Sequence, residues 1–104
     1  MSFDFNAVIG DMLAAMKESV DTDWDDVQGY AKQVIENERE TLLELADQRL
    51  AGLLTDEELK SELEDEKATV AAQLKAVQVM SKAMAQRAAN AAMDVLFNAV
   101  RAAL

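Results

Sequence analysis

The sequence predicts an all-α protein, and three observations support this fold class. The 104 residues include no proline and only three glycines, so few positions interrupt a helix. Strong helix formers (alanine, leucine, glutamate, lysine, glutamine and methionine) dominate the chain. Hydrophobic residues make up 51% of it, which is enough for a packed core and argues against disorder. A chain of this length forms a single domain, which we place over residues 1–104.

The first predicted helix covers about residues 5–19. Asp4 is a suitable N-cap, because its side chain can accept a hydrogen bond from the first turn. Phe3 and Val8 stand where a hydrophobic staple joins the two sides of such a cap. The apolar positions of this segment keep helical spacing: Phe5, Val8, Ile9, Met12, Leu13 and Met16.

The second predicted helix covers about residues 23–51. An acidic break at residues 21–23 precedes it, with Thr22 as the cap. The aspartates that follow fall in the first turn, where negative charge suits the helix dipole. Gly52 ends the helix, because glycine readily adopts the left-handed conformation just past a helix C-terminus.

The third predicted helix covers about residues 56–103. Thr55 and Glu58 match a capping box at its start, and Leu54 and Leu59 match the accompanying hydrophobic staple. No proline or glycine follows within this segment, so the sequence contains no obvious signal that ends the helix early.

The second and third helices should pair as an antiparallel, coiled-coil-like hairpin, because a short connection joins them. Pairing outward from the turn places Leu43 near Glu66 and Ile35 near Leu74. The third helix is the longer of the two, so residues 86–104 extend beyond the hairpin. The short first helix either lies along this overhang or folds back on the second helix.

The C-terminal part of the chain predicts self-association. Its polar residues fall mainly on one helical line, from Lys75 through Gln78 to Arg101, and most other positions are apolar. Such a helix must be buried on several sides, and one covering helix is not enough. We therefore expect an oligomeric helical bundle, with a homodimer favoured because symmetric dimers are the commonest oligomers. The predicted interface residues are Val8, Met12, Met84, Ala88, Ala92, Met93, Leu96, Phe97, Val100 and Leu104.

Glu38 interrupts the apolar stripe of the second helix, between Ile35 and Leu42. A buried carboxylate is costly unless its pKa shifts or a basic group pairs with it, and Arg39, Lys67 or a second chain could supply that group. Glu38 is thus predicted to be a buried polar residue. A polar layer that fixes the helix register is favoured over a functional perturbed acid.

The net charge of −10 is concentrated in one part of the chain. Residues 21–67 hold sixteen acidic and five basic side chains, a net charge of −11, whereas residues 68–104 carry +3. We therefore expect no nucleic-acid partner, since phosphate binding needs clustered lysine and arginine. A solvated acidic face is the simplest interpretation. The alternative is an acidic binding protein or decoy for the basic surface of a nucleic-acid-binding partner.

No pattern predicts catalysis or a cofactor. Without histidine or cysteine, the usual Ser–His and Cys–His pairs cannot form, and three isolated glycines make no phosphate-binding loop. Divalent metal held by carboxylates in a helical bundle is a further alternative, but we assign no ligands because di-iron bundles also use histidine. It rests on two glutamate rows at four-residue spacing: Glu36, Glu40 and Glu44, then Glu58, Glu62 and Glu66.

No segment is expected to span a membrane, because charges such as Arg87 and Asp94 interrupt the apolar C-terminal part. The narrow polar line also differs from the broad basic face of membrane-surface helices. No signal-peptide pattern is present, so we expect a cytoplasmic protein. The sequence therefore predicts a non-enzymatic helical protein that acts by homo-oligomerisation and protein–protein association, as a structural component, adaptor or assembly factor.

Overall fold

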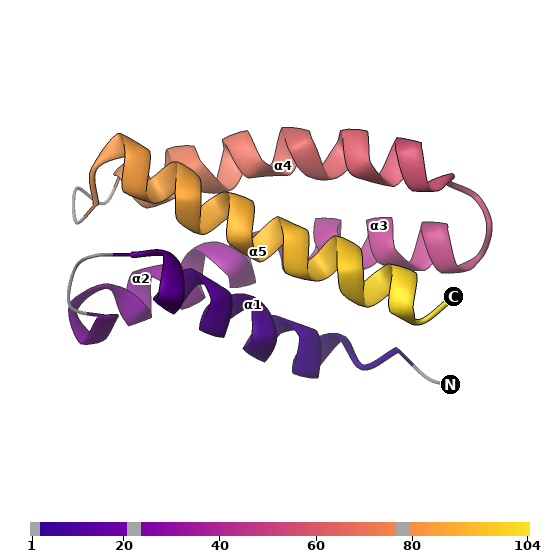
Figure 1. The fold of residues 1–104 in the computed structure, drawn as a ribbon, viewed down its shortest axis with the longest axis horizontal. Helices are drawn as coiled ribbons and strands as arrows, with labels where there is room; N and C mark the ends of the chain where they lie inside the picture. The colour runs from indigo at the N-terminus through magenta and orange to yellow at the C-terminus, as the bar shows by residue number, and fades with distance from the viewer. Residues whose placement is uncertain (1–2, 21–23, 77–79) are drawn as a thin grey trace.

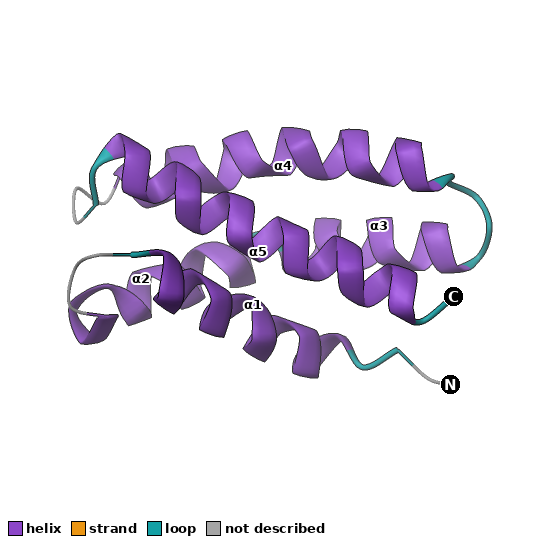
Figure 2. Cartoon of the chain, in the orientation of Figure 1, coloured by secondary structure: helices purple, strands orange, loops and turns teal. Residues whose placement is uncertain are grey.

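The computed structural model describes residues 3–20, 24–76 and 80–104. These residues form five α-helices and no strand (Figure 2). The helices are α1 (Phe5–Ser19), α2 (Trp24–Asn37), α3 (Arg39–Leu50), α4 (Asp56–Ala76) and α5 (Lys82–Ala102). The predicted all-α fold class is confirmed.

The helices form an up-and-down bundle (Figure 1). In it, α2 and the following α3 lie end to end and together take the place of one long helix. α5 packs on α1 along one side and on α4 along the other. α2 and α3 each pack on α4, as the predicted hairpin requires. The bundle measures 38 × 23 × 19 Å.

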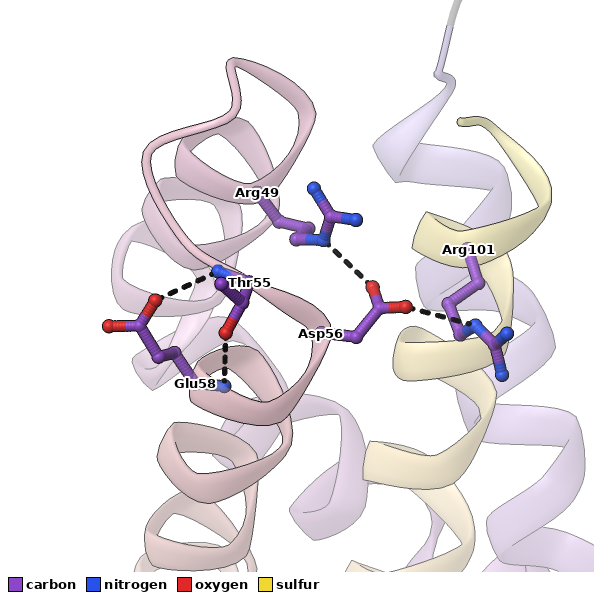
Figure 3. A network of polar contacts seen from close by, with 5 residues as sticks. All are labelled: Arg49, Thr55, Asp56, Glu58 and Arg101. Atoms are coloured by element: carbon purple, nitrogen blue, oxygen red, sulfur yellow. Dashed lines mark hydrogen bonds and ion pairs between the residues drawn. The ribbon is translucent and has the colours of Figure 1, made fainter.

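The predicted starts of two helices are confirmed by their hydrogen bonds. Asp4 Oδ1 accepts from the backbone N–H of Ala7 at 3.2 Å. At the start of α4, the Glu58 N–H donates to Thr55 Oγ1 at 3.1 Å, and the Thr55 N–H donates to Glu58 Oε1 at 3.0 Å (Figure 3). This reciprocal pair is a capping box. The predicted cap at Thr22 lies outside the described residues.

The end of α3 is also as predicted. Gly52 has a φ of +80°, in the left-handed region. Its N–H donates to the Arg49 carbonyl at 3.1 Å, and the Leu53 N–H donates to the Gln48 carbonyl at 2.8 Å. These two bonds form a Schellman motif, which satisfies carbonyls that the helix leaves free.

The predicted continuous helix over residues 23–51 is wrong, because it is interrupted at Glu38. Glu38 has φ −99° and ψ 1°, and its N–H donates to the Ile35 carbonyl, three residues back, at 3.1 Å. Six polar residues in succession, 36–41, separate the buried Ile35 from the buried Leu42. No apolar side chain therefore anchors this turn to the core, and the helix breaks there.

The predicted continuous helix over residues 56–103 is also wrong. α4 ends at Ala76, and Ser81 caps α5 by accepting from the Met84 N–H at 3.1 Å. The chain reverses between the two helices, so residues 86–104 lie back along α4 and do not form an overhang (Figure 1). Burial explains the reversal, because the apolar faces of α4 and α5 cover each other. Gln78 lies outside the described residues.

The position of the first helix, which the sequence left open, is decided by this reversal. α1 packs along α5 and also contacts α2. The resulting core is apolar, and no polar or charged residue among those described is fully buried. None of the described helices is long and apolar enough to cross a lipid bilayer.

The chain buries as much surface as a folded monomer of its size. Its accessible area is 5903 Å², against about 5,800 Å² expected for a monomer of this mass. Its radius of gyration is 13.2 Å, against about 13 Å for a compact domain of this length. One copy of the chain therefore completes its own core.

Candidate functional site

Most of the residues predicted at an oligomer interface contribute to the core of the chain itself. Of the remaining three, Met84 and Phe97 are half-buried, and Leu104 is 58% exposed. α1 and α4 supply the burial that the sequence had assigned to a second subunit. The residues buried within the chain are Val8, Met12, Ala88, Ala92, Met93, Leu96 and Val100.

Three large apolar side chains are exposed among the described residues. They are Leu53 at 73%, Leu104 at 58% and Tyr30 at 46%. Leu53 belongs to the α3–α4 turn and Leu104 follows α5, and these two segments lie at the same end of the bundle (Figure 1). The exposed leucines therefore share one end of the molecule.

Ion pairs hold the elements of this end together. Asp56 Oδ1 lies 2.8 Å from Arg49 Nε, and Asp56 Oδ2 lies 3.6 Å from Arg101 Nε (Figure 3). The Arg101 guanidinium also stands 5.8 Å from the centre of the Phe97 ring, within range of a cation–π contact. One carboxylate thus joins α3, α4 and α5.

A groove of about 410 Å³ runs along the outer face of α3 to the turn that follows it. Its residues recur every three or four positions, so they lie on one face of the helix. Leu43, Ala51 and Leu53 provide apolar surface, and three carboxylates stand beside it. The lining residues are Glu40, Leu43, Glu44, Asp47, Gln48, Ala51 and Leu53.

The arginines of α3 leave the groove acidic. Arg39 pairs with Glu36 at 3.5 Å and donates to Asn6, while Arg49 pairs with Asp56. Within the described residues, no ion pair involves the carboxylates of the groove. The groove therefore combines an apolar floor with uncompensated negative charge.

Glu38 is half-buried, so its prediction as a buried residue is wrong. Its Oε1 accepts from Gln73 Nε2 at 2.7 Å. Neither predicted basic partner pairs with Glu38. Arg39 pairs with Glu36 instead. Lys67 Nζ lies 2.9 Å from a carboxylate oxygen of Glu64 and 2.9 Å from one of Asp94. The break in the helix leaves Glu38 partly in water, which avoids the cost of full burial.

Gln73 extends this contact into a polar layer between helices. Its Oε1 accepts from Asn37 Nδ2 at 3.3 Å, while its Nε2 donates to Glu38. The contacts agree with the predicted hairpin pairing, in which Ile35 lies near Leu74. They also favour the structural interpretation of Glu38, in which a polar layer fixes the register of two helices.

Glu66 is the perturbed acid, and the sequence interpretation missed it. Its Oε2 is buried and forms no hydrogen bond within the described residues. Burial, followed by the negative charge of Glu38, raises the pKa of Glu66 to about 7. The available signal was its spacing, because Glu66 interrupts the apolar series Leu59, Leu63, Val70 and Leu74.

The glutamate rows do not form a metal-binding cluster. In the part of the chain that the structure describes, no three acidic side chains come together in a suitable arrangement. Lys67 also neutralises part of the acidic surface by bridging Glu64 and Asp94. Burial lowers the pKa of Lys67, but its bonds to the two carboxylates outweigh that effect and raise it.

No family model, curated protein or solved structure matches this chain. A functional argument therefore depends on the residues and their arrangement. The surface at α3 and the adjoining end of the bundle combines exposed leucines, a groove and unpaired charge.

Proposed function

We propose that this chain is a non-enzymatic protein that acts by protein–protein association, as a structural component, adaptor or assembly factor. One observation carries the proposal: Leu53 and Leu104 are exposed at one end of a bundle that completes its own core. Single exposed apolar residues are common, but Leu53 continues into an apolar groove. A partner that covers this surface would remove it from water.

The side-chain chemistry supports association over catalysis. The chain has neither histidine nor cysteine, so the common nucleophile–base pairs are not available to it. The raised pKa of Glu66 has a structural cause, namely burial beside Glu38. Perturbed groups of this kind also occur in purely structural positions.

Self-association is the simplest form of the proposal. A symmetric dimer would bring two copies of the same bundle end together. Leu104 and the half-buried Phe97 would then lie at the contact, as the sequence had predicted for those two residues. Association with a different protein through α3 is the other form.

Site-specific photo-crosslinking of the full chain tests the proposal. A benzophenone side chain is placed at Leu53, at Leu104 or, as a control, at the exposed Tyr30. Each protein is irradiated alone and then in an extract of its source cells. We expect several-fold more adduct at Leu53 and Leu104 than at Tyr30, and equal yields at all three positions would contradict the proposal.

Native mass from light scattering over a dilution series separates the two forms. A dimer that persists to low micromolar concentration, and that Leu104→Asp dissociates, supports self-association. A monomer throughout, combined with adducts of other masses at Leu53, supports a different partner. A dimer that Leu104→Asp leaves intact would contradict self-association through this end.

A further inference from the structure

We propose that the groove of α3 binds a basic amphipathic helix of another protein, whose apolar residues cover Leu43 and Leu53 and whose lysines or arginines face Glu44 and Asp47. The inference rests on the proposed function and names the chemistry of the partner. It also assigns a role to three carboxylates of the acidic region, those of Glu40, Glu44 and Asp47.

The groove is long enough for a short helix. Its lining runs from Glu40 to Ala51 on one face of α3, a length of about 17 Å or three helical turns. Leu42 and Ala46 are the fully buried residues of α3, and Glu40, Glu44 and Asp47 on its outer face are exposed. A partner helix can lie alongside α3 without displacing another element.

The apolar part of the groove results from the helix end. In a Schellman motif the residue after the glycine commonly packs on the residues three or four positions before the helix end. Here those positions are Gln48 and Asp47, which offer Leu53 little apolar surface. Leu53 consequently remains 73% exposed and forms a ready contact for an apolar side chain.

The negative charge of the groove favours a positively charged partner. Glu40, Glu44 and Asp47 lie beside the apolar floor with no ion pair among the described residues. This arrangement attracts a cationic segment, and it repels nucleic-acid phosphates and anionic lipids.

A second copy of this chain fits the groove poorly. Each copy carries a net charge of −10, so the acidic surfaces repel one another. The most basic helical region, α5, uses its apolar face within its own core, where Ala88 and Leu96 are fully buried. It cannot offer both apolar and basic side chains to a neighbour.

Fluorescence anisotropy with a synthetic peptide tests the inference. The probe is a labelled helix-forming peptide of about 14 residues, with leucines on one face and flanking lysines. Wild type is compared with Leu53→Ser and with the double variant Glu44→Lys/Asp47→Lys. The matched control is Asp11→Lys/Glu18→Lys, which makes the same charge change at exposed positions on α1.

We expect saturable binding to wild type that weakens about tenfold or more between about 0.1 M and about 1 M salt. Leu53→Ser and the groove double variant should each weaken binding at least about tenfold, and the control by about twofold or less. Circular dichroism checks that each variant keeps its helices, as expected for exposed sites.

Three results would overturn the inference: no binding to wild type, unchanged binding by Leu53→Ser, or equal losses in the two double variants. The last would show that the peptide responds to overall charge alone. None of these results affects the crosslinking yields at Leu53 and Leu104, so failure of the groove is distinguishable from failure of the association proposal.

Discussion

Glu66 and Glu38 form a carboxyl pair between α4 and the break that separates α2 from α3. Burial of Glu66 and the adjacent Glu38 charge raise the Glu66 pKa from 4.5 to about 7. In the unfolded chain Glu66 regains its ordinary pKa. Between these two pKa values, the folded protein therefore binds more protons at this site than the unfolded chain.

The first prediction concerns stability against pH. A raised folded-state pKa means that the contribution of Glu66 is complete below its unfolded pKa of 4.5 and is lost as pH rises to about 7. One pKa unit corresponds to about 1.4 kcal/mol, and solvent screening of a partly exposed carboxyl reduces the effect, so we expect a loss of about 1–2 kcal/mol. Urea unfolding of wild type across this range measures it.

Glu66→Gln isolates this contribution. The glutamine side chain at position 66 cannot ionise. The free energy of unfolding of the variant should therefore equal that of wild type near pH 5 and exceed it by about 1–2 kcal/mol near pH 8. Glu57→Gln, which changes an exposed residue of the same helix, is the control. Its free energy of unfolding should change with pH in the same way as that of wild type. If the free energy of unfolding of Glu66→Gln has the same pH dependence as that of wild type, the Glu66–Glu38 pair does not control the pH dependence of stability.

The second prediction compares two leucines of the C-terminal region. Leu96 is fully buried and Leu104 is exposed. Leu96→Ala should lower the free energy of unfolding by about 2–5 kcal/mol, because it leaves a cavity. Leu104→Ala should change it by less than about 0.5 kcal/mol. Comparable losses in denaturant titrations, measured at one protein concentration, would contradict the internal packing of α5.

The third prediction compares two glycines with opposite outcomes. Gly52 has a positive φ, so Gly52→Ala should destabilise the protein by about 1–2 kcal/mol. Gly29 lies inside α2 with open space around its Cα, so Gly29→Ala should stabilise by about 0.5–1 kcal/mol. Thermal unfolding followed by circular dichroism measures both. A stabilising Gly52→Ala would argue against the Schellman motif.

The fourth prediction concerns the ion pairs of Asp56. Asp56→Asn weakens its bonds to Arg49 and Arg101, and we expect a loss of at most about 1 kcal/mol at low salt. The loss should shrink as salt rises to about 1 M, because the pairs are partly exposed. Glu57→Gln removes the same charge from the same helical turn and is the control. If Asp56→Asn and Glu57→Gln lower the free energy of unfolding equally, the loss comes from the interaction of negative charge with the helix dipole and not from the ion pairs.

The local ends of the helices could be predicted from the sequence, because neighbouring residues decide them. Asp4 caps α1, Thr55 and Glu58 cap α4, and Gly52 ends α3. Ser81 caps α5 in the same way, but this cap was not predicted, because no proline or glycine marks the end of α4. Propensity alone therefore did not locate the reversal between α4 and α5.

The candidate site was less predictable. Glu38 was recognised from its place in an apolar stripe, and Glu66 has the same signature in α4. Both residues are half-buried, and which carboxyl has its pKa raised depends on how the helices meet, since among the described residues only the Oε2 atom of Glu66 is fully enclosed without a hydrogen bond. The groove of α3 depends on which face the bundle leaves open.

The sequence by itself determined that this protein is helical, that caps lie at Asp4 and Thr55, and that its charge is concentrated in residues 21–67, because these properties follow from residue type and short-range spacing. Only the tertiary structure decided that the C-terminal region folds back between α1 and α4 and covers its apolar surface within the chain. The physical reason is that burial depends on contacts between distant segments. The same contacts left Leu53 and the acidic face of α3 exposed to solvent.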